Sequence, residues 1–321
     1  MSAKPADPEL MVVLFGVNRA LSITHPNLQR QVLEPLERQA VRHGISWAFN
    51  EIGALRNPRS REVGLSTEFE SARALKALQG TLLDQGEVDR ITQPHFEAAA
   101  ACGDPWDDGF VSLRNHLRYL YVLKVASQQA LALAPDCRWF FFVRPDLLFA
   151  EPLDLAGLIA RHPDPHQEVL VSASWQRWGG TNDRFALATR GAAQTYGLRY
   201  GQIGPFLRQG VGPLHAEIFL QWCLDQQPAI DQSPSISATA HRVRCKESPQ
   251  LLAAMDLSLP GLVAAQRAVL GSVQEWINQR SPEQIKAELA ALDREGAALL
   301  GPLLAGLPPW GESTGDQDLS R

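Results

Sequence analysis

The chain is poor in cysteine, and its cysteines are not placed as zinc or disulfide sites require. Four occur among 321 residues, Cys102, Cys137, Cys223 and Cys245, and no two form a C-x-x-C pair. Zinc knuckles and redox motifs need such pairs, and disulfide-stapled folds need cysteines at higher density. The spacing therefore indicates reduced thiols in a cytoplasmic protein.

Long apolar runs are missing as well. No uninterrupted apolar stretch approaches the roughly 20 residues of a transmembrane helix. The opening segment, MSAKPADPELMVVLFGV, lacks the charged region, longer apolar core and cleavage site of a signal peptide. We therefore expect no transmembrane segment and a cytoplasmic location, and peripheral contact with the inner membrane face stays open.

The chain also lacks an excess of basic residues and the best-known nucleotide and hydrolase motifs. Its net charge is −5, whereas nucleic-acid-binding domains carry basic patches, so nucleic acid is not expected as a partner. Apolar residues make up 45% and charged residues 20%, the balance of an ordinary soluble globular protein. G-x-G-x-x-G, G-x-x-x-x-G-K-[ST], G-x-S-x-G and H-E-x-x-H are all absent, which leaves no sign of a dinucleotide fold, P-loop, serine hydrolase or zincin.

What the chain does have is a strongly apolar strand that ends in charge. Cys137–Phe149 reads CRWFFFVRPDLLF, and the apolar run Trp139–Val143 predicts a strand buried on both faces. The proline of Arg144-Pro145-Asp146 should end this strand and leave Asp146 at its carboxyl edge. Open α/β sheets bind ligands at that edge, so this carboxylate is a candidate for holding a cation or a polyol. The alternative is an ordinary turn aspartate.

Strand and helix patterns alternate along the chain. A strand at Leu10–Val17, a helix at Pro26–His43 and a strand at Ile45–Ile52 predict a right-handed β-α-β unit and a parallel sheet. The clearest helix, Ser112–Leu133, has a wide apolar stripe and leads into the buried strand. The other expected helices are Phe69–Leu83, Pro152–Ala160, Gly191–Tyr200 and Pro213–Gln227, and the other strands are Val88–Thr92, Glu168–Trp175, Phe185–Thr189 and Ser235–Lys246.

Beyond Ser248 the composition changes. Gln250–Leu307 is rich in Ala and Leu, with two helical patterns and a capping box formed by Ser281 and Gln284. The expected division is a catalytic sheet domain at 1–248, a helical extension at 249–307 and a disordered tail at 308–321. The extension is expected to dock on the first domain or to mediate self-association.

Chemically capable side chains gather in three places, each at a strand end or a helix start. They are Arg144 with Asp146, the loop Trp178–Arg184, and His215 with Glu217 and the strand end His241–Lys246. Carboxylates with a divalent cation bind diphosphate oxygens, and arginine binds phosphate bidentately. Asn, Asp and Trp suit a sugar, because hydroxyls need hydrogen bonds and C–H faces pack on aromatic rings. Singly, each group is at least as well explained as a sharp turn, a charged helix start or a solvated strand face.

The order of the motifs adds to this pattern. A G-x-x-R-like element at Phe15–Leu21 is followed by Arg-Pro-Asp, Asn-Asp-Arg-Phe-Ala-Leu, His-Ala-Glu and Val-Arg-Cys. This order resembles a group of bacterial glycosyltransferases of the GT-A type, found in lipopolysaccharide and surface-polysaccharide gene contexts. The resemblance covers about Val12–Lys246. It implies a GT-A-like (Rossmann-like) α/β fold, with a mixed, mostly parallel sheet flanked by helices and a C-terminal helical appendage.

The resemblance also implies a nucleotide-sugar donor, a glycan or lipid-linked acceptor, and a divalent cation, Mn²⁺ or Mg²⁺, that bridges the donor diphosphate. Asp146 takes the place of the last carboxylate of the family's D-x-D motif, whereas Arg144 replaces the first. Either Asp146 holds the metal together with a later residue such as His241, or Arg144 partly replaces the metal.

Residue roles follow from the same resemblance. Glu217 is placed like the general base of inverting enzymes, and Asp183 is the alternative base. Arg242 or Arg244 would stabilise the departing diphosphate together with the cation. The remaining expected contacts to donor or acceptor are Arg19, Arg144, Trp178, Asn182 and Arg184.

Two other functions compete with sugar transfer in polysaccharide biosynthesis. A non-catalytic carbohydrate-binding or scaffold protein would have the same fold without the two carboxylates that bind the metal. The replacement of the first of these carboxylates by Arg144 suggests this alternative. A phosphohydrolase using Asp146 is weaker, because an aspartyl nucleophile usually stands in a D-x-D-x-T context that this chain lacks.

Overall fold

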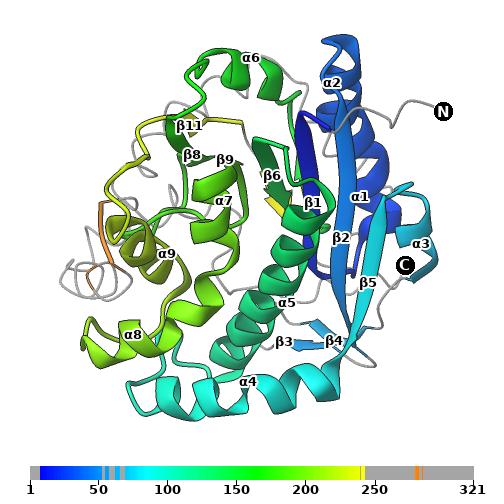
Figure 1. Cartoon of the computed structure of the whole chain (residues 1–321). Coiled ribbons are helices and arrows are strands. Elements are labelled where there is room, and N and C mark those ends of the chain that lie inside the picture. The colour runs from blue at the N-terminus through cyan, green and yellow to red at the C-terminus, as the bar shows by residue number, and fades with distance from the viewer. Residues whose placement is uncertain are drawn as a thin grey trace, which may run out of the picture.

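The computed structural model describes residues 8–52, 55–57, 62–65, 69–238, 240–242, 279–281 and 284. These residues build one mixed sheet with helices on both of its faces (Figure 1). Its strands are β1 (Leu10–Val17), β2 (His43–Glu51), β5 (Gln79–Asp84), β6 (Trp139–Val143), β8 (Glu168–Ala173), β9 (Phe185–Thr189), β10 (Ile230–Asp231) and β11 (Ser235–Ile236). The α/β class and the mixed, mostly parallel sheet predicted from the sequence are confirmed.

The strand order places a switch point between β1 and β6. The order is β10-β8-β9-β6-β1-β2-β5, with β11 beside β8. Strands β1, β2, β5 and β6 are parallel, and β9 runs antiparallel to both of its neighbours. The chain leaves β1 toward β2 and β5, and then returns to put β6 on the other side of β1. Open α/β sheets bind ligands at such a point, outside the carboxyl ends of the strands.

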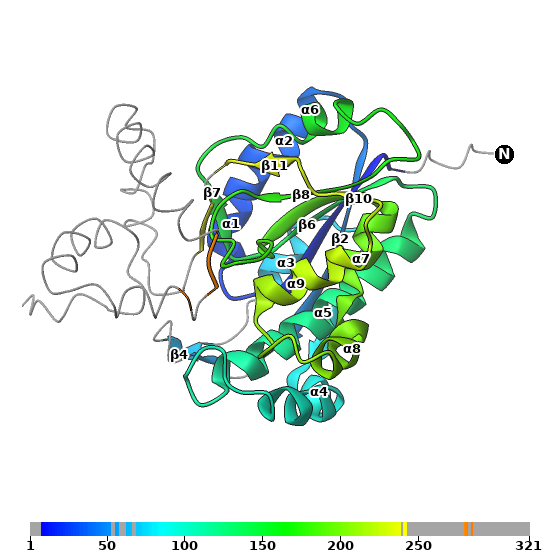
Figure 2. The same cartoon turned by 90° about the vertical axis from the view of Figure 1, so that its left-hand side faces the viewer.

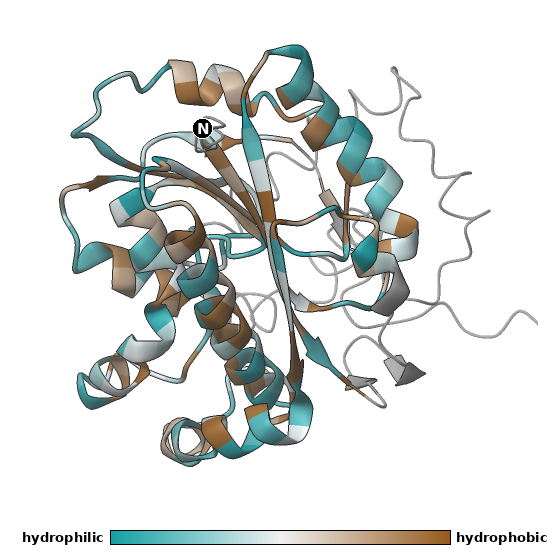
Figure 3. Cartoon of the chain, turned by 45° about the vertical axis from the view of Figure 1, so that its right-hand side comes forward, coloured by the Kyte–Doolittle hydropathy of each residue, from teal (hydrophilic) through white to brown (hydrophobic). Residues whose placement is uncertain are grey.

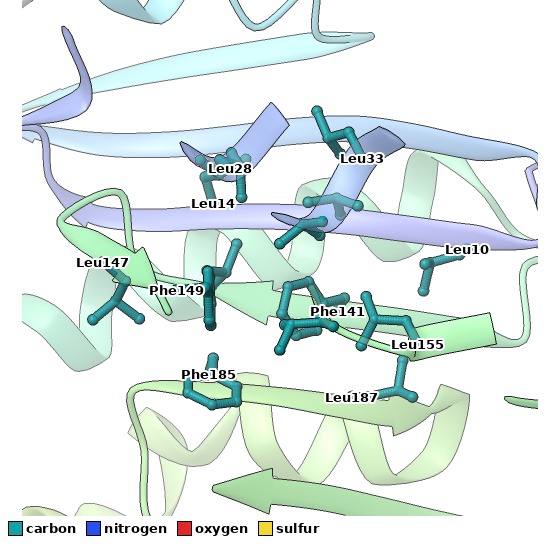
Figure 4. Packing of buried hydrophobic residues seen from close by; sticks show 14 of the residues in the cluster. Leu10, Leu14, Leu28, Leu33, Phe141, Leu147, Phe149, Leu155, Phe185 and Leu187 are labelled. Atoms are coloured by element: carbon teal, nitrogen blue, oxygen red, sulfur yellow. The ribbon is translucent and has the colours of Figure 1, made fainter. Parts of the chain in front are cut away.

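Alternate residues of the central strands pack on opposite faces of the sheet. One cluster joins Leu10, Val12, Leu14 and Phe141 to α1 (Leu21–Leu28), the π-helix η1 (Gln29–Leu33), α2 (Glu34–Arg38) and α6 (Leu155–Ala160) (Figure 4). The other joins Met11, Val13, Phe15 and Phe142 to α5 (Val111–Leu133), α7 (Arg190–Gly197) and α9 (Ala216–Asp225). Figure 2 shows the sheet between these two groups of helices.

The remaining elements extend this core at its ends. A third apolar cluster packs α4 (Gln85–Ala100) and the start of α5 against the 3-10 helix η3 (Arg199–Gln202), α8 (Ile203–Arg208) and α9. Two small antiparallel pairs form from β3 (Leu55–Asn57) with β4 (Glu62–Leu65), and from β7 (Leu147–Phe149) with β12 (Ala240–Arg242). A short helix, α3 (Phe69–Arg73), precedes β5. Figure 3 shows apolar residues concentrated on the strands and on the inner faces of the helices.

Three sequence predictions in the described region are wrong. The helix expected over 69–83 is helical only in α3, and its second half is the strand β5. The strand expected over 88–92 lies inside α4, because Asp84 caps this helix by accepting from the Glu87 N–H at 2.9 Å. The final strand expected over 235–246 is divided between β11 and β12, which belong to different sheets.

The C-terminal region is described at a few residues only. Ser281 N–H donates to Gln284 Oε1 at 2.8 Å, and Gln284 N–H donates to Ser281 Oγ at 3.2 Å, so the predicted capping box is confirmed. The rest of the expected extension at 249–307 and the tail at 308–321 lie outside the described residues. In the part of the chain that is described, no helix combines the length and apolarity needed to cross a membrane.

Candidate functional site

Asp146 is buried between two arginines at the carboxyl ends of β1 and β6. Arg144 donates from Nε to Oδ1 and from Nη2 to Oδ2, both at 2.9 Å. Arg19 Nη2 lies 3.1 Å from the same Oδ2. Burial alone would lower the pKa of Arg144, but the Asp146 carboxylate outweighs it and raises that pKa. We call Arg19, Arg144 and Asp146 the arginine clamp.

Helix α1 holds the clamp in place. Thr24 Oγ1 donates to the Pro145 carbonyl at 2.5 Å. Asn27 binds both backbone groups of Phe149, accepting from its N–H at 2.7 Å and donating to its carbonyl at 3.0 Å. Because proline has no N–H for the sheet, the turn after β6 depends on these side chains for its position.

The loop between β8 and β9 reaches the same edge of the sheet. Strand β9 runs opposite to β6, so its first residue, Phe185, pairs with Val143, the last residue of β6. Strand β8 runs parallel to β6 and therefore ends at this edge. Residues 174–184 consequently start and finish beside the clamp, and we call them the β8–β9 loop.

Asp183, near the end of this loop, belongs to a buried polar cluster. Its Oδ2 lies 3.5 Å from Nη2 of Arg199, whose side chain has no exposed surface. The Asp183 carbonyl accepts from the hydroxyls of Tyr119 at 2.5 Å and Tyr196 at 2.7 Å. Burial, and next the Asp183 charge, raises the pKa of Tyr119 well above its ordinary value, so this hydroxyl stays a donor. The Arg144 guanidinium lies 5.5 Å from the Tyr119 ring centre and joins this cluster to the clamp.

Glu217 lies in the first turn of α9, in contact with the β8–β9 loop. Its Oε2 is 3.3 Å from Nδ1 of His215, and both side chains are largely buried. The Thr181 N–H donates to the Glu217 carbonyl at 3.1 Å. Trp106 covers the His215 ring, with ring centres 5.4 Å apart. The loop and the helix that carry the two candidate bases are therefore joined through the backbone.

Arg184 brings these groups into one electrostatic unit. Its guanidinium lies 5.2 Å from the ring centre of Trp175. Burial lowers the pKa of Arg184, and the charge of Glu217 is the strongest opposing effect, with Asp183 and Asp146 also opposing and Arg144 adding to the decrease. Charges interact this way only at short range. Six predicted site residues belong to this end of the sheet: Arg19, Arg144 and Asp146 in the clamp, Asp183 and Arg184 in the β8–β9 loop beside it, and Glu217 on α9, whose backbone accepts from that loop.

Asn182 has a structural role that the sequence did not reveal. It is fully buried, and its Nδ2 donates to the Trp175 carbonyl at 2.8 Å while its Oδ1 accepts from the Arg184 N–H at 3.0 Å. These bonds hold the two ends of the β8–β9 loop together. The predicted sugar contact of Asn182 stays a prediction, because its amide is already bonded to backbone.

Trp178 stands at the tip of the same loop, half-buried and with a left-handed φ of 50°. The next residue, Gly179, has a φ of 75°, which glycine adopts without strain. A Cβ on Gly179 would lie 3.0 Å from the backbone oxygen of Arg280. Arg280 and Ser281, from the described part of the C-terminal region, therefore lie against Gly179 at the tip of this loop, next in sequence to Trp178.

Strand β12 brings the predicted basic segment to the clamp. It pairs antiparallel with β7 and places Arg242 opposite Leu147 and His241 opposite Leu148. Leu147 directly follows Asp146, so the backbone of this segment passes next to the clamp. Arg244 and the side chains of His241 and Arg242 lie outside the described residues, and their predicted roles stay predictions.

The side chains around Asp146 do not fit a divalent cation. Mg²⁺ and Mn²⁺ take carboxylate and other oxygen ligands, whereas a guanidinium has only donors and repels a cation. Both oxygens of Asp146 already accept from Arg144, and one of them also faces Arg19. Among the residues whose side chains are described, no three His, Cys, Asp or Glu gather as a metal site. The predicted cation therefore rests on the family resemblance.

Several residues that build this site were missed by sequence reasoning. They are His116, Tyr196 and Arg199, which are buried, and Tyr119, which is half-buried. Burial lowers the pKa of His116 to about 3, with the Asp183 charge opposing, so this ring is neutral in the fold. A usable signal existed on α5, because His116 and Tyr119 lie on a helix face that is otherwise apolar. Polar groups on such a face need buried partners.

A hollow of about 360 Å³ lies at the opposite edge of the sheet, where β6 and β8 begin. Arg138 and Arg190 line it, and both donate to backbone carbonyls, Arg138 to Gln167 and Arg190 to Leu131 and Ala134. Its arginines are thus committed to holding loops. The hollow is remote from the clamp and takes no part in the candidate site.

Comparison with known proteins gives likeness in chain path only. No protein-family model matches the chain, and no curated protein matches its sequence. Among solved structures, mouse xyloside xylosyltransferase 1 in its apo form is 11% identical with a TM-score of 0.37, over 71% of this chain and 84% of that chain. Core-mannan synthase A from Aspergillus fumigatus, in its Mn/GDP form, is 12% identical with a TM-score of 0.41, over 78% and 79%.

An active-site mutant of LgtC is 10% identical with a TM-score of 0.38, over 70% of this chain and 72% of that chain. At these identities and TM-scores, none of the likenesses carries an argument about the chemistry of this chain. A xylosyltransferase and a mannan synthase are thus among the solved structures that this chain resembles, and its own side chains have to carry any functional assignment.

Proposed function

We propose that the chain is a glycosyltransferase that moves a sugar from a nucleotide-sugar donor to a hydroxyl of a glycan or other acceptor. The observation that carries this proposal is the position of the arginine clamp. It lies at the switch point between β1 and β6, where open α/β sheets bind ligands, with two further carboxylates on the adjoining loop and helix. Cationic groups beside carboxylates in one place match the needs of sugar transfer.

Sugar transfer needs positive groups at the departing diphosphate and a negative carboxylate at the acceptor hydroxyl. The acceptor oxygen forms a bond to the anomeric carbon as the bond between that carbon and the diphosphate oxygen breaks. The electron pair leaves with the diphosphate, where guanidinium groups stabilise the added charge. The acceptor proton passes to a carboxylate, which has to lie on the side of the sugar where the acceptor enters.

Glu217 is the better candidate for the base. Its carboxylate belongs to the first turn of α9 and has His215 Nδ1 at 3.3 Å, a neighbour that can orient it. Asp183 has the buried Arg199 as its partner, and its carbonyl is held by two tyrosine hydroxyls. This arrangement gives Asp183 a structural task in positioning the β8–β9 loop.

The sugar would lie against the β8–β9 loop. The Trp178 ring is half-buried at its tip, and the Arg184 guanidinium stacks on Trp175 nearby. Flat aromatic faces take the C–H side of a sugar, and guanidinium N–H groups take its hydroxyls. A lipid-linked or surface-polysaccharide acceptor, as the sequence resemblance implies, is part of this proposal.

The proposal is tested with the full chain and a panel of UDP-, GDP-, CDP- and TDP-sugars, each with and without Mn²⁺. The first measurement is the melting temperature, which rises for any ligand that binds the folded state. The second is release of the nucleoside diphosphate with water as the acceptor, which needs no knowledge of the natural acceptor. We expect one nucleotide class to raise the melting temperature and to be released from its sugar.

Three outcomes are distinguished by this design. A shift with release supports a transferase. Binding of glycans without binding or turnover of any sugar nucleotide supports the carbohydrate-binding alternative. A complete panel that neither shifts the melting temperature nor releases nucleotide contradicts the proposal.

A further inference from the structure

The arginine clamp is a preformed site for an anion. Two guanidinium groups share one carboxylate, so the clamp carries a net positive charge in a buried position. Arg144 uses Nε and Nη2 on Asp146, and its Nη1 has no acceptor among the residues that the structure describes. The Arg144 side chain is 17% exposed, whereas that of Asp146 is fully buried. The open part of the clamp is therefore a donor group, and its carboxylate is turned inward.

The position of these charges defines what the clamp can bind. A phosphate or diphosphate oxygen at the carboxyl edge of β1 and β6 would meet guanidinium N–H groups, whose planar fork matches phosphate oxygens. A divalent cation in the same place would meet two positive charges and a carboxylate whose two oxygens are already occupied. The electrostatics of the clamp thus favour an anion over a cation.

We infer that Arg144 and Arg19 bind the donor diphosphate directly, without a divalent cation, and that Asp146 orients the two guanidinium groups instead of ligating metal. This inference rests on the proposed function, because it takes the bound anion to be a nucleoside diphosphate. It changes the task of Asp146 from metal ligand to positioning residue. The clamp supplies the positive charge that a cation supplies in metal-dependent transferases.

Preorganisation explains how two arginines suffice. The Asp146 bonds and the Thr24 bond to Pro145 fix Arg144 before the ligand arrives, so little side-chain freedom is lost on binding. The Tyr119 ring lies 5.5 Å from the Arg144 guanidinium and adds a cation–π contact. A fixed, weakly hydrated guanidinium in a partly dry place binds phosphate oxygens more strongly than one in water.

Calorimetry with inorganic pyrophosphate, UDP and GDP tests the inference, in EDTA and again with Mg²⁺ or Mn²⁺. We expect binding in EDTA to be as tight as with metal, and to weaken as salt rises. Arg144→Gln should weaken binding in EDTA about 10-fold or more. Arg118→Gln is the matched control, because Arg118 grips Asp89 in the same bidentate way, at 2.6 and 2.8 Å, away from the clamp.

Asp146→Asn separates the two tasks assigned to this residue. An amide oxygen still accepts from guanidinium but is a poor metal ligand, and the substitution removes one negative charge. Anion binding in EDTA should therefore persist, with a smaller loss than in Arg144→Gln, whereas a metal-ligand role predicts loss of the binding that Mg²⁺ or Mn²⁺ supports. If Arg144→Gln does not fold, Arg144→Lys keeps the charge and loses the fork, and it should weaken binding in EDTA without creating a need for metal.

The outcomes also separate this inference from the proposed function. Binding that appears only with Mg²⁺ or Mn²⁺, or that Arg144→Gln leaves unchanged in EDTA, overturns the inference and leaves a transferase in place. Pyrophosphate binding in EDTA without binding or turnover of any sugar nucleotide keeps the anion site and removes the transferase. No binding of any probe under either condition overturns both.

Discussion

Gly180 and Glu217 meet through their backbones. A Cβ added to Gly180 would lie 2.1 Å from the Glu217 carbonyl oxygen, far inside van der Waals contact. The neighbouring N–H of Thr181 donates to the same oxygen at 3.1 Å. The distance between the β8–β9 loop and α9 is therefore set by the absence of a side chain at position 180.

Gly180→Ala should push the loop away from α9. The clash is with backbone, which cannot rotate aside, so we expect a loss of about 1–3 kcal/mol of stability and a lower rate of donor turnover. Gly201→Ala is the control, because a Cβ there meets nothing within 4 Å. Equal melting temperatures and rates for the two variants would show that the contact is unimportant.

Glu217→Gln should remove the base and leave the donor site intact. General-base catalysis is worth about 10²–10⁴ in rate, so kcat should fall by at least the lower value while the affinity for nucleoside diphosphate stays the same. The readouts are single-turnover release of nucleoside diphosphate and calorimetric binding. An unchanged kcat in this variant would contradict Glu217 as the base and would favour Asp183, the alternative.

Asp183→Asn should act mainly on folding. It leaves Arg199 buried without its charged partner, and breaking a buried ion pair costs about 3–5 kcal/mol. We expect a large decrease in the urea midpoint, with kcat per folded molecule changing less than in Glu217→Gln. Folded protein is counted by near-ultraviolet circular dichroism, so that stability and turnover are separated.

Asn182→Ala tests whether this amide contacts sugar or holds the loop. Loss of the amide leaves the Trp175 carbonyl and the Arg184 N–H without partners, at about 1–3 kcal/mol for each buried group. We expect a lower melting temperature in the absence of any ligand. An increase in KM for the donor at unchanged melting temperature would instead indicate direct contact with sugar. Gln202→Ala, at an exposed side chain, is the control.

His116 should make the protein less stable in acid. Burial lowers its pKa to about 3 in the fold, whereas a histidine in the unfolded chain has its ordinary pKa of 6.5. The unfolded chain therefore takes up a proton that the fold excludes. This contribution is fully present above pH 6.5 and is lost as pH falls toward 3, at up to about 1.4 kcal/mol per pH unit.

His116→Phe should flatten this part of the pH profile. The ring contacts with Tyr119 and Trp106 can be kept, and the buried Nε2 has no hydrogen-bond partner among the described residues, so no bond is lost. The measurement is the free energy of unfolding in urea at several values between pH 4.5 and 7.5. An identical acid slope in the variant would assign the effect to other groups, such as His25 and His95, whose pKa values burial also lowers.

The parts of the fold that the sequence predicts well are the fully buried strands and the longest helix. Strands β1, β6 and β9 have the predicted bounds. A short run of apolar residues flanked by polar ones is typical of a strand that is buried on both faces of a sheet. Helix α5 differs from the prediction by a single residue at its start. In these segments local pattern and tertiary burial demand the same structure.

The failures occur where tertiary contacts overrule local pattern. The residues just before Gln79 are rich in helix formers, so the prediction extended the helix through the next residues. Those residues pair with β2 instead and form the edge strand β5. In α4, the apolar residues near Val88 imitate a strand, and Pro94 lies inside the helix, where proline is uncommon. The Asp84 and Glu87 pair was the missed signal, because an acceptor followed three residues later by Glu is the pattern of a helix start.

Of the candidate site, the placement could be predicted but the pairing could not. Asp146 and Glu217 were expected at strand ends and helix starts, and the sheet topology brings them to one edge. The sequence does not show that Arg19 and Arg144 share the Asp146 carboxylate, since that depends on β1 and β6 becoming neighbours. The roles of Arg199 and Tyr119 depend in the same way on distant helices packing together.

The pairing of β1 with β6 has a consequence for how the protein is made. Arg19 leaves the ribosome long before Asp146, so in a nascent chain that stops short of Trp139 this guanidinium lacks the Asp146 carboxylate, and strand β1 still has one open edge. Charged side chains near open strand edges discourage sheet-to-sheet association. We expect Arg19 to hinder association of the unfinished sheet during synthesis, and the arrival of β6 to bring the Asp146 carboxylate against the same guanidinium.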